Sequence, residues 1–229
     1  MTFPDGTIEY YKKIRELMPE KSKVLDFGSG RGSWIHNDDN IERRQLRDLH
    51  YKKSKVIGVD IDDAVLSNSK NDENYILTSS WVEENKNTFD LITADFVLEH
   101  IADKKSFFIT INKLLKKGGF FCARTPHKYS YIAILSMLTP TIFHKAILKK
   151  AQPNRNHIDV FKAYYRLNTL TCLENLFVDF KDKSYIYTPE PAYFVKSRLL
   201  RYLLCCIHKF LPRFFSGQLF IFKKKVNGI

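Results

Sequence analysis

The sequence predicts an α/β fold: a doubly wound, mostly parallel seven-stranded sheet with a helical insertion, or cap, after the fifth strand. Short runs rich in β-branched residues alternate with amphipathic stretches through the first part of the chain. Parallel strands need long crossover connections, and helices in those connections cover both faces of the sheet. The alternation stops after Pro126, and residues 127–166 are too many for an ordinary loop in a compact domain, so we assign the insertion there.

The predicted elements follow one another in a regular order. The predicted strands are 23–27, 55–60, 75–78, 89–94, 119–124, 184–188 and 218–224. The predicted helices, which repeat apolar residues every three to four positions, are 41–51, 62–69, 103–116, 168–177 and 192–211. Asn168 or Thr169 is expected to cap the fourth of these helices. All the elements fit one domain, residues 1–229, because this length is typical of a single large α/β domain.

The last predicted helix, 192–211, is amphipathic. Its apolar face is formed by Leu199, Leu200, Leu203, Leu204, Ile207, Phe210 and Leu211, and the opposite, basic face by Arg198, Arg201, His208 and Lys209. Because a helix before the last strand is expected to cover the sheet, we expect the apolar face to lie in the core. The basic face is then free to meet an anionic ligand or membrane.

The net charge of +12 lies entirely in the second part of the chain. Residues 1–126 hold 20 basic and 20 acidic side chains, and residues 127–229 hold 17 basic and 5 acidic ones. Such asymmetry indicates an acidic partner, whether nucleic acid, anionic lipid or a phosphorylated small molecule. The composition, 44% hydrophobic and 27% charged, excludes a disordered, collagen-like or coiled-coil chain.

Cysteine spacing and the N-terminal residues indicate the compartment. The four cysteines form no CxxC pair, so we expect reduced thiols and no metal site. The first 20 residues are charged throughout, and the longest uncharged run, 129–143, is too short to cross a bilayer. We therefore expect a cytoplasmic protein, with a peripheral contact to the inner membrane face through its basic C-terminal part.

A glycine-rich turn follows the first predicted strand, in Asp26-Phe27-Gly28-Ser29-Gly30-Arg31-Gly32. Glycine has no Cβ, so a ligand can lie against backbone N–H groups at the carboxyl edge of the sheet. The G-x-G-x-G spacing differs from the G-x-G-x-x-G of dinucleotide-binding folds, which argues against an NAD-dependent oxidoreductase. At the end of the second strand, Asp60 is placed to accept both hydroxyls of a ribose.

These residues resemble motif I and the second-strand acid of the class I S-adenosylmethionine-dependent methyltransferases, which have a Rossmann-like fold. Residues 89–101, FDLITADFVLEHI, and 114–121, LLKKGGFF, are similar to segments of the small-molecule methyltransferases of types 11 and 12. The four blocks occur in the expected order and cover about residues 20–126. The resemblance implies a methyltransferase whose cofactor is S-adenosylmethionine.

The resemblance also implies a cofactor site at the carboxyl edge. The glycine turn would pass under the methionine part of the cofactor, and the acid before the turn would orient it. Asp60 would hold the ribose, Ile61 would pack on adenine, and Ala94 with Asp95 would face the sulfonium. The residues expected to form this site are Asp26, Gly28, Ser29, Gly30, Gly32, Asp60, Ile61, Ser79, Ala94 and Asp95.

The third strand departs from the family pattern. It often ends in an acid that reads the adenine amino group, whereas this chain continues with Ser79-Ser80-Trp81. Ser79 or Ser80 is expected to take the place of the acid. Trp81 either stacks on the cofactor or anchors the loop to the core.

The sulfonium is an activated methyl donor, so the protein has to align an acceptor, exclude water and, for a hydroxyl acceptor, remove a proton. His100 and His127 follow the fourth and fifth strands and are the candidate bases, because imidazole titrates near neutral pH. Each is alternatively a structural contact or a pocket wall. No Asn/Asp-Pro-Pro-aromatic segment follows the fourth strand and no Cys follows a Pro, which argues against amino methylation of adenine or glutamine and against cytosine C5 methylation.

The acceptor is expected to contact the insertion. Residues 159–169 resemble a stretch of methyltransferases from bacterial surface-polysaccharide gene clusters. Arg166 is a candidate for binding a carboxylate or phosphate with two hydrogen bonds, and His157 is a further candidate. The apolar run 129–143 is followed by basic residues, which suits an acceptor with an apolar part and an anionic head, such as a lipid-linked sugar.

Three hypotheses follow for the function. The first is an O-methyltransferase for an anionic small molecule, sugar or lipid-linked glycan. The second is an RNA methyltransferase, favoured by the charge and by interleaved aromatic residues, although the sequence contains no separate RNA-binding module. The third is a non-catalytic adenosylmethionine-binding or membrane-surface protein that keeps the fold.

Overall fold

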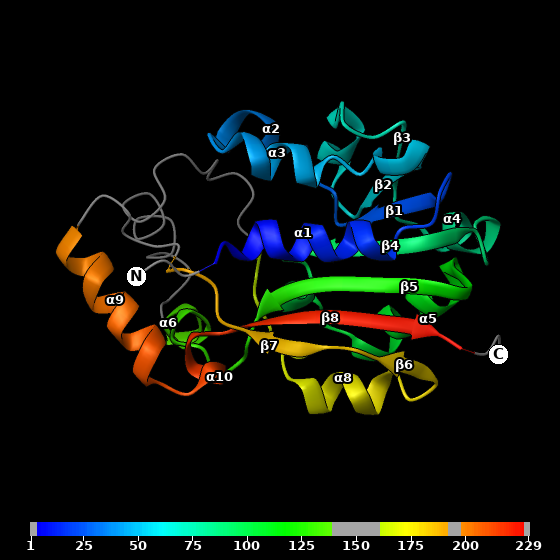
Figure 1. The fold of residues 1–229 in the computed structure, drawn as a ribbon. Coiled ribbons are helices and arrows are strands. Elements are labelled where there is room, and N and C mark those ends of the chain that lie inside the picture. The colour runs from blue at the N-terminus through cyan, green and yellow to red at the C-terminus, as the bar shows by residue number, and fades with distance from the viewer. Residues whose placement is uncertain (1–3, 139–160, 192–197, 227–229) are drawn as a thin grey trace.

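The computed structural model describes residues 4–138, 161–191 and 198–226. Its strands are β1 (Lys23–Phe27), β2 (Lys55–Asp60), β3 (Glu73–Ile76), β4 (Phe89–Asp95), β5 (Leu115–Pro126), β6 (Phe180–Asp182), β7 (Tyr185–Tyr187) and β8 (Gln218–Lys225). They form one sheet in the order β3-β2-β1-β4-β5-β8-β6, with β7 also paired to β8 (Figure 1). The first five strands are parallel and β8 runs antiparallel to β5, which confirms the predicted doubly wound, mostly parallel sheet.

The edge of the sheet beyond β8 is one strand position filled by two short segments. β6 and β7 both pair antiparallel with β8, the first near its end and the second near its start. Between them the Lys183 N–H donates to the Phe222 carbonyl at 3.0 Å, so the chain continues along the same edge. The sequence predicted one strand at 184–188, which is β7; the first half of this edge was not predicted.

The bounds of the first three strands can be compared with the predicted ones. β1 and β2 occupy the predicted residues, whereas β3 lies two residues earlier than predicted. The reason is Thr78, whose side chain caps α4 (Ser79–Glu84) by accepting a hydrogen bond from the Trp81 N–H. A residue that caps a helix must leave the strand before it.

Helices cover both faces of the sheet. One face packs against α4, α5 (Lys104–Leu114) and α8 (Leu170–Leu176), and the other packs against α1 (Gly6–Leu17) and the end of α3 (Ile41–Arg47). The predictions for α3, α5 and α8 are confirmed with shorter bounds, but α1 was not predicted. Asp5 caps α1, which buries Tyr10 and Ile14 against the sheet.

The crossover after β2 is not the α-helix predicted at 62–69. The chain forms a 3-10 helix, η2 (Asp63–Ser67), because Asp62 caps its start and Asn68 ends it by turning its side chain toward the glycine turn. Two shorter elements, η1 (Tyr51–Lys53) and α2 (Trp34–Asn37), fill the crossover between β1 and β2. A second 3-10 helix, η3 (Leu98–His100), follows β4.

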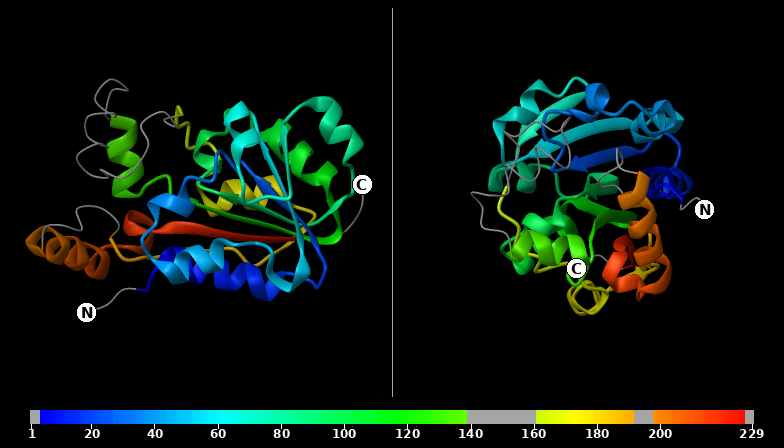
Figure 2. Two further views of the ribbon diagram at one scale, coloured as in Figure 1. Left: turned by 90° about the horizontal axis from the view of Figure 1, so that it is seen from above. Right: turned by 90° about the vertical axis from the view of Figure 1, so that its left-hand side faces the viewer.

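β5 leads directly into α6 (Tyr131–Leu138), the described beginning of the predicted insertion. Residues 139–160 of the insertion, including His157, lie outside the described residues. Toward the C-terminus, α9 (Arg198–Phe210) and α10 (Arg213–Ser216) precede β8. Both α6 and α9 project from the end of the sheet at which β5 ends (Figure 1 and the left view of Figure 2).

The prediction that the apolar face of the last helix lies in the core is wrong for Leu199, Leu203 and Phe210, although Leu204 of the same predicted face is buried. Leu199, Leu203 and Phe210 are exposed, and α9 packs instead on α10. The sheet beside it is already covered, because Phe220 of β8 stacks on the Tyr187 ring at 4.4 Å and meets the Tyr10 ring edge-on at 5.5 Å. Because these aromatic rings already cover that face of β8, α9 cannot pack on it.

Candidate active site

The glycine turn leaves the end of β1 with three residues in the left-handed region. Gly28, Gly30 and Gly32 have φ angles of +73°, +50° and +68°. A side chain at Gly28 would place its Cβ 2.4 Å from a methyl group of Val97, whereas a Cβ at Gly30 would meet nothing within 4 Å. The turn is therefore packed against the segment after β4 and open at Gly30, where a ligand can approach the backbone.

Asp26 lies at the start of the turn. Its Oδ2 accepts a hydrogen bond from the Ser29 hydroxyl at 2.7 Å. Burial raises the pKa of the Asp26 carboxyl to about 6, and the Ser29 hydrogen bond opposes this shift only in part. A cation that binds next to a buried carboxylate stabilises its ionised form.

Asn68 holds the turn from the other side, and the sequence analysis missed it. Its side-chain amide lies within hydrogen-bonding distance of the Ser29 hydroxyl, at 2.9 Å, and of the Gly30 carbonyl, at 3.2 Å. A Cβ at Gly32 would lie 2.4 Å from the Asn68 side chain. No pattern marks Asn68 in the sequence, because this contact spans about 40 residues and depends on the sheet bringing two crossovers together.

Asp60 also contacts the turn. Its Oδ2 accepts the Gly30 N–H at 2.9 Å, and its Oδ1 accepts the Asp62 N–H at 3.1 Å. Each carboxylate oxygen has a second lone pair, so Asp60 can accept further hydrogen bonds from a ligand. The neighbouring Ile61 is 73% exposed, an apolar surface beside the carboxylate.

The residues after β3 are divided between surface and core. Ser79, the first residue of α4, is exposed and can reach a ligand. Trp81 is buried, and its ring stacks on Phe89 at 6.1 Å. Of the two interpretations of Trp81, the structure therefore supports an anchor in the core.

Asp95, at the end of β4, is the centre of a buried ion-pair network. Arg124 donates to it twice, from Nε at 2.7 Å and from Nη2 at 2.8 Å, and the Tyr11 hydroxyl donates at 3.1 Å. Burial would raise the pKa of Asp95, but Arg124 and Arg47 outweigh it and hold the pKa below its ordinary value. The carboxylate expected to face the sulfonium is thus engaged by protein donors, and the adjacent Ala94 is fully buried.

The backbone around this network is strained. Phe96 has a φ of +56°, which is rare for a residue with a side chain. The Arg124 guanidinium lies over the Phe96 ring at 4.7 Å and over the Tyr10 ring at 5.2 Å. The two rings hold the guanidinium in place against Asp95, which offsets the cost of the strained residue.

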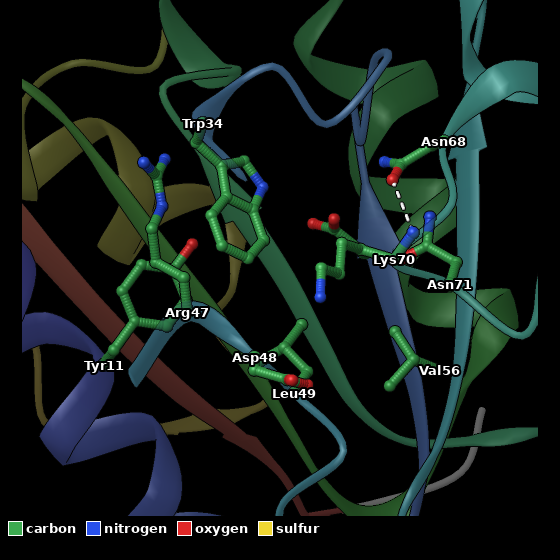
Figure 3. Close-up of a pocket in the computed structure, with 10 residues that line it drawn as sticks. Tyr11, Trp34, Arg47, Asp48, Leu49, Val56, Asn68, Lys70 and Asn71 are labelled. Carbon is green, nitrogen blue, oxygen red and sulfur yellow. Dashed lines mark hydrogen bonds between the residues drawn. The ribbon is translucent and has the colours of Figure 1, made fainter. Parts of the chain in front are cut away.

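A small cavity of about 20 Å³ adjoins the network. Figure 3 shows Trp34, Arg47 and Tyr11 on one side of it and Asn68, Lys70 and Asn71 on the other. The Arg47 guanidinium lies 5.2 Å from the Trp34 ring centroid, and its Nε is buried without a hydrogen-bond partner. Together with Asp26, which also lines the cavity, Arg47 gives the site one acid and one guanidinium that can meet a zwitterionic ligand.

His100 and His127 have different hydrogen-bond partners. His100 Nδ1 lies 3.0 Å from the Lys162 carbonyl, so Nδ1 carries the proton and Nε2 keeps its lone pair. His127 Nδ1 accepts the Tyr129 N–H at 3.2 Å, and the ring makes a further hydrogen bond with the Phe214 backbone. Burial lowers the pKa of His127, and no ring nitrogen of His127 is left to take a proton from a substrate.

The acceptor-side residues that the structure describes have mainly structural contacts. Arg166 donates to the Ala102 carbonyl at 2.6 Å, although its side chain is exposed. Thr169 caps α8, whereas Asn168 is buried and donates to the Thr125 hydroxyl at 2.6 Å. The expectation of a cap is therefore right for Thr169 and wrong for Asn168.

A buried acid near His100 was not singled out by the sequence. Glu99 accepts a hydrogen bond from the Thr125 hydroxyl at 2.7 Å, and burial raises its pKa. Its carbonyl oxygen accepts the N–H groups of Tyr164 and Tyr165 at 2.7 and 3.1 Å, which ties the end of the insertion to η3. Glu99 therefore joins β4, β5 and the insertion beside the candidate base.

A second hollow, of about 230 Å³, lies at the opposite edge of the sheet from the glycine turn, near the start of β5. Its charged lining consists of Lys117, Lys181, Lys224 and Lys225. No cluster of three or more His, Cys, Asp or Glu side chains suitable for a metal ion occurs within residues 4–138, 161–191 and 198–226.

The candidate site lies at the carboxyl edge of the sheet, where the glycine turn follows β1 and Asp60 ends β2. Both lie in the part of the chain that matches a known family. The methyltransferase domain family matches residues 7–166. The chain belongs to this family. The match begins in α1 and includes the glycine turn, the Asp95 network and His100, so the candidate site is part of the methyltransferase domain itself.

Solved structures show the same methyltransferase fold. An S-adenosylmethionine-dependent methyltransferase from Mesorhizobium loti is 16% identical, with a TM-score of 0.57 over 96% of this chain and 99% of that chain. One from Archaeoglobus fulgidus is 17% identical, with a TM-score of 0.54 over 95% and 92%. One from Methanosarcina mazei is 17% identical, with a TM-score of 0.54 over 94% and 98%. No curated protein matches this methyltransferase domain significantly.

Proposed function

We propose that this methyltransferase domain transfers the methyl group of S-adenosylmethionine to an oxygen atom of an anionic acceptor, a small molecule, sugar or lipid-linked glycan. The observation that best supports S-adenosylmethionine as the cofactor is the open glycine turn, in which the Gly30 N–H donates to the Asp60 carboxylate at 2.9 Å. Structures of S-adenosylmethionine-dependent methyltransferases with this fold support the same choice.

The residues at the turn fit this cofactor chemically. S-adenosylmethionine carries an amino-acid end, a sulfonium, a ribose and an adenine. The Asp26 carboxylate suits its ammonium group, and the unpartnered Arg47 Nε suits its carboxylate. Asp60 would accept the ribose hydroxyls and Ile61 would pack on adenine, while Ser79 is exposed near the end of β3.

The bound cofactor supplies an activated methyl group, and the chain must position and deprotonate the acceptor. His100 is the base in this proposal, because its Nδ1 proton is directed at the Lys162 carbonyl and its Nε2 lone pair remains for an acceptor hydroxyl. Asp95 and Arg124 are positioning residues in this proposal, since their ion pair holds the end of β4 against β5.

The charge of the chain supports an anionic acceptor. The 17 basic and 5 acidic residues after position 126 lie on the insertion and C-terminal part, where Arg166 is exposed to solvent. The resemblance of residues 159–169 to enzymes of polysaccharide gene clusters favours a sugar or lipid-linked glycan. In that case the protein works in the cytoplasm with a peripheral contact to the inner membrane face.

Calorimetry with S-adenosylhomocysteine tests the cofactor. We expect the wild type to bind, and Asp60→Ala to lose at least about tenfold in affinity because two ribose hydrogen bonds are removed. Asp63→Ala is the matched control, because Asp63 is exposed on η2 and has no hydrogen bond to the turn. A wild type that does not bind, or Asp60→Ala with unchanged affinity, contradicts the proposal.

Transfer of a labelled methyl group to lipid, sugar and RNA fractions tests the acceptor. We expect label in the lipid or sugar fraction. Label in RNA alone would replace the proposal with an RNA methyltransferase. Binding of S-adenosylhomocysteine without label in any fraction would support the non-catalytic alternative.

A further inference from the structure

The apolar face of α9 is directed away from the protein. Leu199 is 72% exposed and Phe210 is 77% exposed, whereas Leu204 and His208 on the other side of the helix are buried. At about 100° per residue, Leu199, Leu203 and Phe210 form one stripe along α9. A helix of this kind normally buries its stripe, so the exposed stripe of α9 requires a partner.

α6 contributes a second apolar surface at the same end of the molecule. Leu135 is 60% exposed and Leu138 is 74% exposed, and Tyr129, just before α6, is also exposed. Figures 1 and 2 show α6 and α9 projecting beyond the end of the sheet at which β5 ends. We call these exposed side chains of α6 and α9, together with Tyr129, the apolar tip.

The charges around the apolar tip indicate an anionic partner. Lys128 lies 5.9 Å from the Tyr129 ring centroid and Lys209 lies 5.5 Å from the Phe210 ring centroid, so cations border the apolar side chains. Arg213, at the start of α10, is exposed nearby. The described helices α6, α9 and α10 contain no acidic residue.

We propose that the apolar tip docks on the surface of an anionic lipid bilayer, with Lys128, Lys209 and Arg213 at the level of the lipid headgroups. Apolar side chains enter the headgroup boundary, and each nearby cation adds electrostatic attraction to anionic lipids. Within the described residues no helix is long and apolar enough to cross a membrane, and α9 has 13 residues, so the helix lies along the surface.

The charges favour a bilayer over a second copy of the chain. Two copies meeting through the apolar tip would bring Lys128, Lys209 and Arg213 of both copies together, and such like-charge contacts are unfavourable. An anionic membrane neutralises the same cations. The tip projects from the end of the sheet at which β5 ends, and the glycine turn lies at the same end because β1 and β5 run in the same direction. Docking would therefore turn this end of the sheet toward an acceptor held in the membrane.

The contact between α6 and α9 gives the tip a defined shape. The Tyr131 hydroxyl lies 3.0 Å from His208 Nε2, and His208 Nδ1 lies 2.9 Å from the Pro189 carbonyl. One histidine thus links α6, α9 and the segment before α9. The inference deepens the proposed function by naming where the acceptor is presented, but its test needs no methyl transfer.

Vesicle co-sedimentation of the full chain tests the inference. We expect the wild type to bind vesicles of phosphatidylcholine mixed with phosphatidylglycerol and to bind pure phosphatidylcholine at least about tenfold more weakly. Phe210→Glu should reduce binding to the anionic vesicles by about tenfold or more, because it removes an inserted ring and adds a negative charge. Lys209→Gln with Arg213→Gln should weaken binding and reduce its dependence on salt.

Val178→Glu is the matched control, because Val178 is equally exposed but lies after α8, outside the apolar tip. It should bind vesicles as the wild type does. Circular dichroism and S-adenosylhomocysteine binding check that each variant is folded, so loss of vesicle binding with intact cofactor binding separates this inference from the proposed function. Equal binding to neutral and anionic vesicles, no binding by the wild type, or unchanged binding by Phe210→Glu overturns it, as does a dimer that Phe210→Glu dissociates in the absence of lipid.

Discussion

Asp26 and Asp95 are carboxylates at the same edge of the sheet, yet their partners differ. Asp26 accepts one hydrogen bond from the Ser29 hydroxyl, and burial raises its pKa to about 6. Asp95 is held by Arg124 and Arg47, which keep its pKa low despite burial. The charge of Asp95 is therefore compensated within the protein, whereas the charge of Asp26 is compensated only in part.

We expect Asp26→Asn to stabilise the ligand-free protein and to weaken cofactor binding. The pKa of Asp26 is raised in the folded state, so its contribution to stability is present below the unfolded pKa of about 4 and is lost as the pH rises through about 6. The variant should gain about 3 kcal/mol in free energy of unfolding at pH 8 and little at pH 4. Denaturant unfolding at both pH values measures this.

Asp39→Asn is the control for that prediction, because Asp39 is exposed and lies outside the turn. Its free energy of unfolding should change by less than about 0.5 kcal/mol. Calorimetry should show weaker S-adenosylhomocysteine binding by Asp26→Asn alone. The difference in free energy of unfolding between Asp26→Asn and the wild type should be larger at pH 8 than at pH 4. An equal difference at the two pH values would show that the Asp26 charge is compensated in the folded protein.

His100 and His127 should differ in activity assays. We expect His100→Gln to lower kcat by about a hundredfold or more, with S-adenosylhomocysteine affinity unchanged, because glutamine cannot take the acceptor proton. His127→Gln should lower thermal stability but leave kcat close to that of the wild type, because both nitrogens of His127 bond within the protein. A normal kcat for His100→Gln would identify it as a pocket wall.

At the scale of elements, α9 shows that a helix is positioned by what its polar residues bond to as well as by its apolar stripe. His208 is buried between Tyr131 and the Pro189 carbonyl, and this contact faces Leu204 inward and Phe210 outward. Burial lowers the pKa of His208, so the contact requires the neutral imidazole.

We expect this helix contact to weaken as the pH falls. The folded pKa of His208 is below its unfolded value of about 6.5, so its contribution to stability is present above that value and is lost as the pH falls through the folded pKa. His208→Gln should be less stable than the wild type by about 1 kcal/mol at pH 7.5, and the difference should narrow at pH 5. Thermal melts at the two pH values measure it, with exposed His36→Gln as the control. A difference that stays constant with pH would mean that His208 is not the titrating group.

At the scale of the whole molecule, the net charge differs between the two parts of the chain. Residues up to 126 are neutral in sum and contain the glycine turn, while the rest carries the +12. Exposed charges are screened by salt, whereas contacts inside the site are screened far less. The two binding steps should therefore respond differently to ionic strength.

We expect the KM of the labelled acceptor to rise with sodium chloride while the affinity for S-adenosylhomocysteine changes by less than about twofold. Replacing Lys128 and Lys209 by Gln should remove much of this salt dependence. Replacing Lys181 and Lys224, which line the hollow at the opposite edge, should leave it unchanged. An acceptor KM that does not depend on salt would mean that the basic half serves another purpose.

Sequence patterns predicted an element correctly where residues close together in the chain determine it. β1 and β2 were predicted with their observed bounds because buried parallel strands are short apolar runs ended by the turn. α1 was missed because its charged residues hide the pattern of Tyr10 and Ile14, whose partners lie on β8 and other strands far along the chain. Asp26, Gly28 and Asp60 were predicted from the turn motif, whereas the contacts of Asn68 and Arg47 with this region appear only in the folded crossovers.

The alternation of strands and helices along the chain, the glycine turn with its acids and the separation of charge can all be read from the sequence, because each depends on residues close together in the chain. Folding then determines which buried polar groups find partners within the protein. Arg124 reaches Asp95, both nitrogens of His127 find partners, and α9 faces its stripe outward, all through contacts between residues distant in sequence. Hydrogen bonds and burial depend on where distant segments meet, and that meeting exists only once the sheet has formed.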